Sequence, residues 1–135
     1  MNTKRGVAKW VALVTGAVLC GVGILHDLVN LPSFTRAVAR GLIAERLGPE
    51  LIANVAFGGM AMSLCGLLLV LVAPDLDRGN RTAWRVGLTI GLFYVVDGVA
   101  AYLWLPIAGA LIFSVFGAAV CAPLVVWRRE FPAER

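Results

Sequence analysis

Charged residues, histidine and cysteine are all scarce in this 135-residue sequence. Asp, Glu, Lys and Arg together make up 15% of the chain, whereas soluble domains contain about 25%. Cys20, Cys65 and Cys121 are widely separated, so they lack the CxxC spacing of redox and metal sites and form no disulfide framework. We expect them to be small buried thiols. The single histidine, His26, and the two aspartates within the apolar runs, Asp27 and Asp97, do not have the spacing of a known ligand set, so no metal site is predicted and no cofactor can be named.

Apolar residues are abundant instead. They make up 60% of the sequence, and the mean hydropathy is +0.87, which places the chain among membrane proteins. The formal net charge of +4 could suggest a nucleic-acid partner. However, the basic residues sit in small groups between apolar runs and form no patch with interleaved aromatics, so we expect the lipid bilayer, and no nucleic acid, as a partner.

Four apolar runs are each long enough to cross a hydrocarbon core of about 30 Å, which takes roughly 20 helical residues. We predict a single all-α domain over residues 1–135, an integral membrane four-helix bundle. Its transmembrane helices are expected at about residues 10–30, 51–73, 84–105 and 107–127. Each run is followed by a residue that is expected to end the helix: Pro32, Pro74, Pro106 and Arg128.

The first run follows Lys4, Arg5 and Lys9, as the apolar core of a cleaved signal peptide would. No small-x-small cleavage site follows at the right distance, and Leu19 precedes Cys20 where a lipoprotein signal requires a small residue. We therefore expect this run to remain in the mature protein as a membrane span.

Lys and Arg are concentrated in three regions that a four-span topology places on one side of the membrane. These regions contain Lys4, Arg5 and Lys9; Arg78, Arg81 and Arg85; and Arg128, Arg129 and Arg135. Short loops rich in Lys and Arg are retained in the cytoplasm. We therefore predict cytoplasmic amino and carboxyl termini, in a bacterial inner (plasma) membrane.

The segment between the first two spans, residues 33–47, has a helical pattern of its own. Phe34, Val38, Leu42 and Ile43 recur at helical spacing, while polar residues occupy the other angles. We interpret this segment as an amphipathic interfacial helix between helices 1 and 2, lying on the outer membrane surface. The alternative is a solvated connector with a frayed helix.

Each span carries a stripe of small or polar residues at spacings of three and four, and small residues let membrane helices approach closely. The stripes comprise Gly16, Cys20, Gly23, Asp27 and Asn30; Asn54, Gly58, Ala61 and Cys65; Gly87, Gly91, Tyr94, Gly98 and Ala101; and Ala110, Ser114, Gly117 and Cys121. We interpret these stripes as the packing seams of a compact bundle.

Ionisable residues inside membrane spans are costly and are therefore functional candidates. We predict Asp97 and His26 as catalytic residues, because a carboxylic acid and an imidazole can carry acid–base chemistry. Asp97 is expected to be the deepest charge, about two turns from the outer end of its span, and His26 to lie near the outer boundary. Polar residues of the same outer half complete a predicted ligand-binding pocket: Asp27, Asn30, Asn54, Tyr94, Tyr102 and Ser114. The simpler alternative is that Asp97 pairs with His26 or a hydroxyl and only holds helices together.

Glycines at positions 16, 21 and 23 run into His26 and are followed by Phe34. Together with a glycine-bearing second span ending in Leu67, Leu68 and Leu69, and a fourth span of small residues, this pattern resembles the DoxX-like group of small four-helix membrane proteins. The resemblance implies a four-span fold, and some members of that group are tied to quinone or thiol redox chemistry. Tyr94 and Asp97 of the third span do not map onto the group.

Three classes of function fit these features. The first is binding of an apolar or amphiphilic small molecule, such as a lipid, quinone or terpenoid, in an outward-facing polar pocket, with or without acid–base chemistry, so enzymatic activity stays open. The second is a proton-coupled transporter or channel subunit that acts as a homo-oligomer. The third is an accessory subunit of a larger membrane complex.

Overall fold

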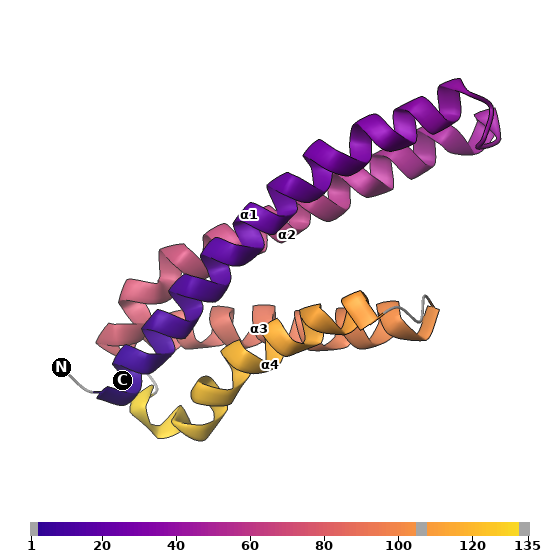
Figure 1. The fold of residues 1–135 in the computed structure, drawn as a ribbon. Coiled ribbons are helices and arrows are strands. Elements are labelled where there is room, and N and C mark those ends of the chain that lie inside the picture. The colour runs from indigo at the N-terminus through magenta and orange to yellow at the C-terminus, as the bar shows by residue number, and fades with distance from the viewer. Residues whose placement is uncertain (1–2, 105–107, 133–135) are drawn as a thin grey trace. The chain divides into compact units, whose positions relative to one another are not determined.

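The computed structural model describes residues 3–104 and 108–132, and these residues are helical with short connections (Figure 1). The elements in chain order are α1 (Thr3–Ala39), η1 (Glu45–Leu47), α2 (Gly48–Arg78), α3 (Arg81–Trp104), α4 (Ala108–Val126) and η2 (Arg128–Glu130). α1 to α4 are each long and apolar enough to cross a membrane. The predicted all-α class with four such helices is therefore confirmed.

The chain divides into two compact units. The first, here called the hairpin unit, is Ala17–Leu67 and holds most of α1, η1 and the first part of α2. The second, the terminal unit, combines Met1–Gly16 with Leu68–Arg135 and includes α3, α4 and η2.

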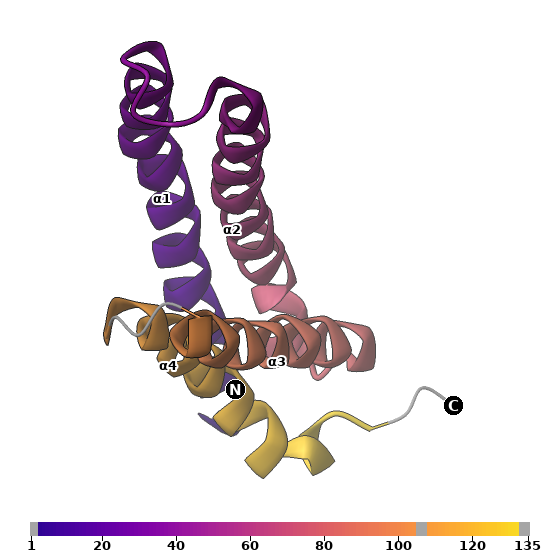
Figure 2. The same ribbon diagram turned by 90° about the vertical axis from the view of Figure 1, so that its right-hand side faces the viewer.

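In the hairpin unit, α1 and α2 run antiparallel side by side (Figures 1 and 2). α1 does not end near Pro32, as predicted, but continues through the proline to Ala39. The side chains of Ser33, Thr35 and Arg36 donate hydrogen bonds of 2.8, 2.8 and 3.0 Å to backbone carbonyls of the preceding turn. Pro32 lacks the N–H that would bond to the carbonyl of Leu28, and a proline is tolerated inside a membrane helix at the loss of this one backbone hydrogen bond.

The segment predicted as a separate interfacial helix is divided in the structure. Residues 33–39 continue α1, a turn with Gly41 at φ +69° follows, and residues 45–47 form the single 3-10 turn η1. The interfacial helix is therefore not confirmed, and the position of this segment at a membrane surface stays a prediction.

In the terminal unit, the small-residue stripes of α3 and α4 pack against each other. A Cβ atom on Gly91 would lie 2.5 Å from Cys121 Sγ, and one on Gly98 would lie 2.5 Å from both the backbone nitrogen and the Oγ of Ser114. No side chain larger than hydrogen fits at these positions without a shift of the neighbouring helix. The predicted seam between the third and fourth spans is confirmed.

One end of the terminal unit gathers the start of α1, the α2–α3 turn and the segment after α4. Lys4 pairs with Glu130 at 3.3 Å, and Lys9 pairs with Asp77 at 3.3 Å. Gly79, at φ +79°, makes the tight turn between α2 and α3, where a left-handed conformation favours glycine. The three basic regions of the sequence thus share one end of this unit.

Three expectations lie on residues outside the described ranges. They are the tight turn around Pro106, the exact ends of the third and fourth spans at Leu105 and Ile107, and the contribution of Arg135 to the basic tail.

Candidate functional site

The predicted site residues fall into the two units in equal numbers. His26, Asp27, Asn30 and Asn54 belong to the hairpin unit, and Tyr94, Asp97, Tyr102 and Ser114 belong to the terminal unit.

In the hairpin unit, His26 and Asp27 form a direct pair on α1. The distance from His26 Nδ1 to Asp27 Oδ1 is 3.1 Å, and in this contact the ring N–H donates to the carboxylate. Both side chains keep some exposure, 33% for His26 and 20% for Asp27. The pair is therefore partly covered and still reachable.

The cover comes from two adjacent glycines of α2. A Cβ atom on Gly59 would overlap the Asp27 carboxylate, and a Cβ atom on Gly58 would lie 3.8 Å from His26 Cε1. One turn further along α1, a Cβ atom on Gly23 would lie 2.5 Å from the Gly59 carbonyl oxygen. The two backbones approach closely here. The absence of a side chain on Gly59 leaves the space that the Asp27 carboxylate occupies, whereas a Cβ atom on Gly58 would make only an ordinary contact with His26.

The face of α2 that meets α1 differs by one residue from the predicted stripe. Gly59 is buried and Ser63 Oγ donates a 3.3 Å hydrogen bond to the carbonyl of Cys20. By contrast, the predicted Asn54 and Gly58 are exposed, so Asn54 is not enclosed beside the pair. The sequence signal that could have identified this face is the Gly-Gly dipeptide, which is costly in a helix interior by about 1 kcal/mol per glycine unless close packing requires it.

The continuation of α1 to Ala39 places three further helical turns between the His26/Asp27 pair and the end of the helix. The nearest charged residue towards the hairpin end of α1 is Arg36, about 14 Å from Asp27, and Glu50 lies about 14 Å along α2 from Gly59. In the other direction, α1 carries no charge until Lys9, about 27 Å from Asp27. The pair therefore lies well inside a charge-free stretch of helix, and its place near the outer membrane boundary stays a prediction.

A small apolar cavity lies on the same side of α1. Asp27, Asn30, Phe34 and Ala37 follow one another at spacings of three and four, so they share one helical face. Phe34 and Ala37 line a cavity of about 210 Å³ together with Ser33 and Ile43. The hairpin thus presents a polar pair and an apolar cavity along one face.

In the terminal unit, Tyr94 and Ser114 are part of the α3–α4 packing. Tyr94 is 2% exposed, and its ring packs edge-on against Phe93 and stacks on Phe113, with centroids 5.3 and 6.1 Å away. Ser114 Oγ donates a 3.0 Å hydrogen bond to the carbonyl of Val95. These contacts hold the helix pair together.

Asp97 and Tyr102, in contrast to Tyr94 and Ser114, are not part of the α3–α4 packing. Both are exposed on α3, and Asp97 precedes Gly98, the residue that meets α4. Within the terminal unit, the Asp97 carboxylate is therefore placed beside the α3–α4 seam and is not enclosed in it.

The described residues define a chain with four helices of membrane-spanning length, a His–Asp pair in one helical hairpin and a glycine seam in the second helix pair. They contain no group of three or more His, Cys, Asp or Glu residues placed to hold a metal ion. Comparison with protein-family models, curated proteins and solved structures gave no match. The resemblance to the DoxX-like group stays a prediction.

Proposed function

We propose that this chain is an integral membrane protein that binds an apolar or amphiphilic small molecule through the His26/Asp27 pair. The single observation that carries the proposal is the place of this pair, 14 Å or so inside a charge-free stretch and against two adjacent glycines. Ionisable residues inside a membrane span are expensive and are retained for function more often than for packing. Large apolar side chains exposed along all four helices, such as Leu28, Phe57, Leu103 and Val126, support insertion into lipid.

The pair supports a definite chemistry. When Nδ1 carries a hydrogen and donates it to Asp27, the neutral ring has a lone pair on Nε2. Nε2 can then accept a hydrogen bond from a hydroxyl group or take up its proton, and the carboxylate orients and stabilises the resulting imidazolium. A ligand with one hydroxyl or carbonyl group, such as a quinol, quinone, fatty alcohol or terpenoid, suits this site.

The apolar cavity further along α1 suits the body of such a ligand. Its 210 Å³ is smaller than the roughly 300–1,000 Å³ of a pocket that encloses a drug-sized molecule. The cavity therefore takes part of an apolar ligand, and the rest lies in the surrounding lipid. This arrangement favours a ligand that enters from the bilayer.

The proposed setting follows the distribution of charge. The end of the terminal unit that holds Lys4 and Glu130 has a large excess of Lys and Arg, and in a bacterial inner membrane such an end lies in the cytoplasm. The turn between α1 and α2 then lies outside, with residues 33–47 at the outer surface and the His26/Asp27 pair accessible from the outer leaflet.

Mass spectrometry of molecules extracted from the purified protein tests the proposal. The wild type is expected to retain an apolar or amphiphilic compound that His26→Ala and Asp27→Asn lose, while Asp97→Asn retains it. Each variant is first checked for native elution and helix content. Equal retention by folded His26→Ala, Asp27→Asn and wild-type protein would rule the site out.

A second candidate rests on the exposure of Asp97. A carboxylate in the middle of an apolar helix is costly when it faces lipid, so it requires water or a polar group as cover. A proton-coupled transporter or channel that works as a homo-oligomer would supply that cover, as would the larger complex of an accessory subunit. If the wild type moves protons together with a solute into liposomes and Asp97→Asn does not, the transporter is favoured. If there is no flux and a protein that co-purifies with the wild type is lost in Asp97→Asn, the accessory subunit is favoured.

A further inference from the structure

The segment after α4 is held firmly against the rest of the terminal unit. Phe131 is 1% exposed, and its carbonyl accepts a 2.9 Å hydrogen bond from Arg81 Nη1. Glu130 pairs with Lys4, and Trp84 Nε1 donates a 2.8 Å hydrogen bond to the carbonyl of Leu124 at the end of α4. η2, which carries Arg128 and Arg129, is therefore fixed in place at both of its ends.

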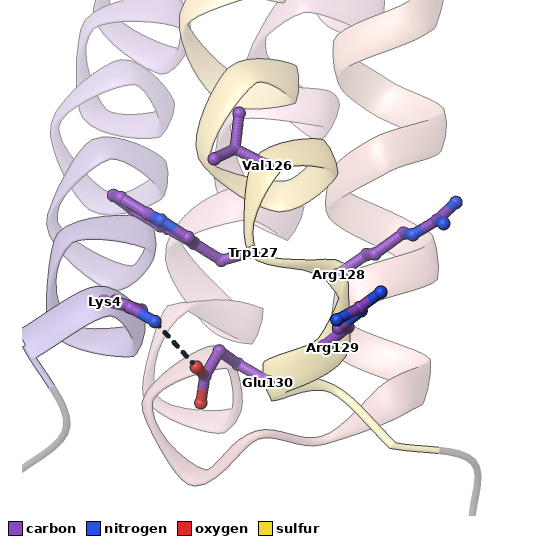
Figure 3. A pocket seen from close by; sticks show the side chains of 6 residues that line it. All are labelled: Lys4, Val126, Trp127, Arg128, Arg129 and Glu130. Atoms are coloured by element: carbon purple, nitrogen blue, oxygen red, sulfur yellow. Dashed lines mark hydrogen bonds and ion pairs between the residues drawn. The ribbon is translucent and has the colours of Figure 1, made fainter.

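This fixed turn lines a cavity of about 400 Å³ (Figure 3). The lining residues are Lys4, Val126, Trp127, Arg128, Arg129 and Glu130. Figure 3 shows Lys4 and Glu130 paired below Trp127, while Arg128 and Arg129 extend together to the other side. Within the described residues neither of these two guanidinium groups has an ion-pair partner.

The charge around this cavity is strongly positive. Most acidic side chains at this end are already engaged, because Glu130 pairs with Lys4, Asp77 with Lys9 and Asp75 with Arg78. The guanidinium groups of Arg128 and Arg129 are thus left to attract an anion. Guanidinium groups bind phosphate oxygens in a fixed fork geometry, and two on one turn suit a single phosphate group.

Apolar surface continues directly from the cationic turn. Val125 and Val126, the last residues of α4, are 53% and 72% exposed, and Trp127 follows them. Tryptophan prefers the level of the lipid headgroups, with its ring beside the acyl chains and its N–H towards water. Along the end of α4, exposed valines are followed by a tryptophan and then by two arginines. This order suits an amphiphile with acyl chains and an anionic headgroup better than a free anion in solution.

We propose that this cavity binds the phosphate headgroup of an anionic phospholipid from the adjacent leaflet. Arg128 and Arg129 hold the phosphate, Trp127 lies at the glycerol level, and the acyl chains run along the exposed valines of α4. Basic pockets at the cytoplasmic ends of membrane helices are suited to such headgroups. The proposal rests on membrane insertion and is independent of the ligand proposed for the His26/Asp27 pair.

Native mass spectrometry of detergent-purified protein with added phosphatidylglycerol or phosphatidylcholine tests this site. Wild-type protein is expected to retain phosphatidylglycerol in preference to phosphatidylcholine. Arg128→Gln/Arg129→Gln should lower the retained phosphatidylglycerol about 10- to 30-fold, since each basic residue near an anionic lipid contributes about 1 kcal/mol. The variant Arg128→Lys/Arg129→Lys keeps the charge without the fork geometry. It should therefore retain less phosphatidylglycerol than the wild type and more than Arg128→Gln/Arg129→Gln.

The matched control is Arg78→Gln/Arg85→Gln. It removes the same charge from the same end, and both arginines are exposed and do not line the cavity. Retention equal to wild type in this control supports a site, whereas an equal loss in both double variants would show a general charge effect and overturn it. Displacement of the lipid by millimolar inorganic phosphate would also overturn the lipid assignment. Retention should be unchanged in His26→Ala, which separates this proposal from the preceding one.

Discussion

At the residue scale, the contact between Asp27 and the backbone of Gly59 joins the proposed binding site to helix packing. The carboxylate occupies the space that any side chain at position 59 would need. His26 is held in turn by its 3.1 Å contact with Asp27. The orientation of the imidazole therefore depends on a glycine in the neighbouring helix, so a substitution that disturbs packing at position 59 should also disturb the proposed binding.

Gly59→Ala is expected to displace the Asp27 carboxylate and to destabilise the hairpin. Overpacking of a tight contact costs about 1–3 kcal/mol, and the displaced carboxylate would no longer orient His26. The free energy of unfolding is measured in detergent, with loss of helix content as the signal. Retention of the co-purified ligand should fall in the same variant.

Gly21→Ala is the control for this prediction. A Cβ atom there would meet no described atom within 4 Å, and alanine is favoured over glycine in a helix by about 1 kcal/mol. Gly21→Ala should therefore leave stability unchanged or raise it. If both alanine variants are equally stable, the close approach of Asp27 to Gly59 is wrong.

At the element scale, the four membrane-length helices could be predicted from apolar run length alone, because hydropathy accumulates over some twenty residues. The end of α1 could not. Pro32 and Pro74 are predicted to end their helices, but α1 continues through Pro32 to Ala39 and α2 continues through Pro74 to Arg78. A proline removes only one backbone hydrogen bond, so a helix with other stabilising contacts can continue past it. The predicted face of α2 is also one residue away from the observed one: the stripe contains Gly58, whereas Gly59 meets α1. Two adjacent glycines fit a small-residue stripe equally well, so the sequence does not distinguish them.

A distance measurement tests the continuity of α1. Spin labels at positions 25 and 39, both exposed, have backbones about 21 Å apart in an unbroken helix. A separate helix beginning at residue 33 and lying on the membrane surface would bend the chain and shorten this distance. Double electron–electron resonance in lipid nanodiscs is expected to report the longer value.

The α3–α4 seam makes its own prediction. Gly98→Ala places a Cβ atom 2.5 Å from Ser114 and should destabilise the terminal unit by about 1–3 kcal/mol. Gly109→Ala, at a position where a Cβ atom meets no described atom within 4 Å, should have little effect. The comparison is made by denaturant titration in detergent, and equal midpoints for the two variants would contradict the packing of α3 on α4.

At the scale of the whole molecule, charge asymmetry determines the expected orientation. The start of α1, the α2–α3 turn and η2 meet at one end, tied by the Lys4/Glu130 and Lys9/Asp77 pairs. The sequence predicted that these regions share a side, because Lys and Arg alternate with apolar runs. Whether the eight predicted site residues come together could not be predicted, since that depends on the rotation of each helix about its axis, and small residues at several angles leave the rotation open.

The orientation is tested by labelling with a membrane-impermeant maleimide in intact cells. In a variant without the native cysteines, a cysteine at exposed position 42, in the α1–α2 turn, should react from outside. A cysteine at exposed position 82, at the start of α3, should react only after the cells are permeabilised. The reverse pattern would contradict cytoplasmic termini.

The most direct test of the central claim uses the fact that the chain has a single histidine. Nitrogen NMR of protein labelled with histidine that carries ¹⁵N in the ring alone reports only the two ring nitrogens of His26. Spectra are recorded before and after the co-purified amphiphile is exchanged for detergent. We predict a hydrogen-bonded Nδ1–H that depends on Asp27, and an Nε2 resonance that shifts when the amphiphile is removed. An Nε2 resonance that is the same with and without the amphiphile would contradict the assignment of the His26/Asp27 pair as the binding site.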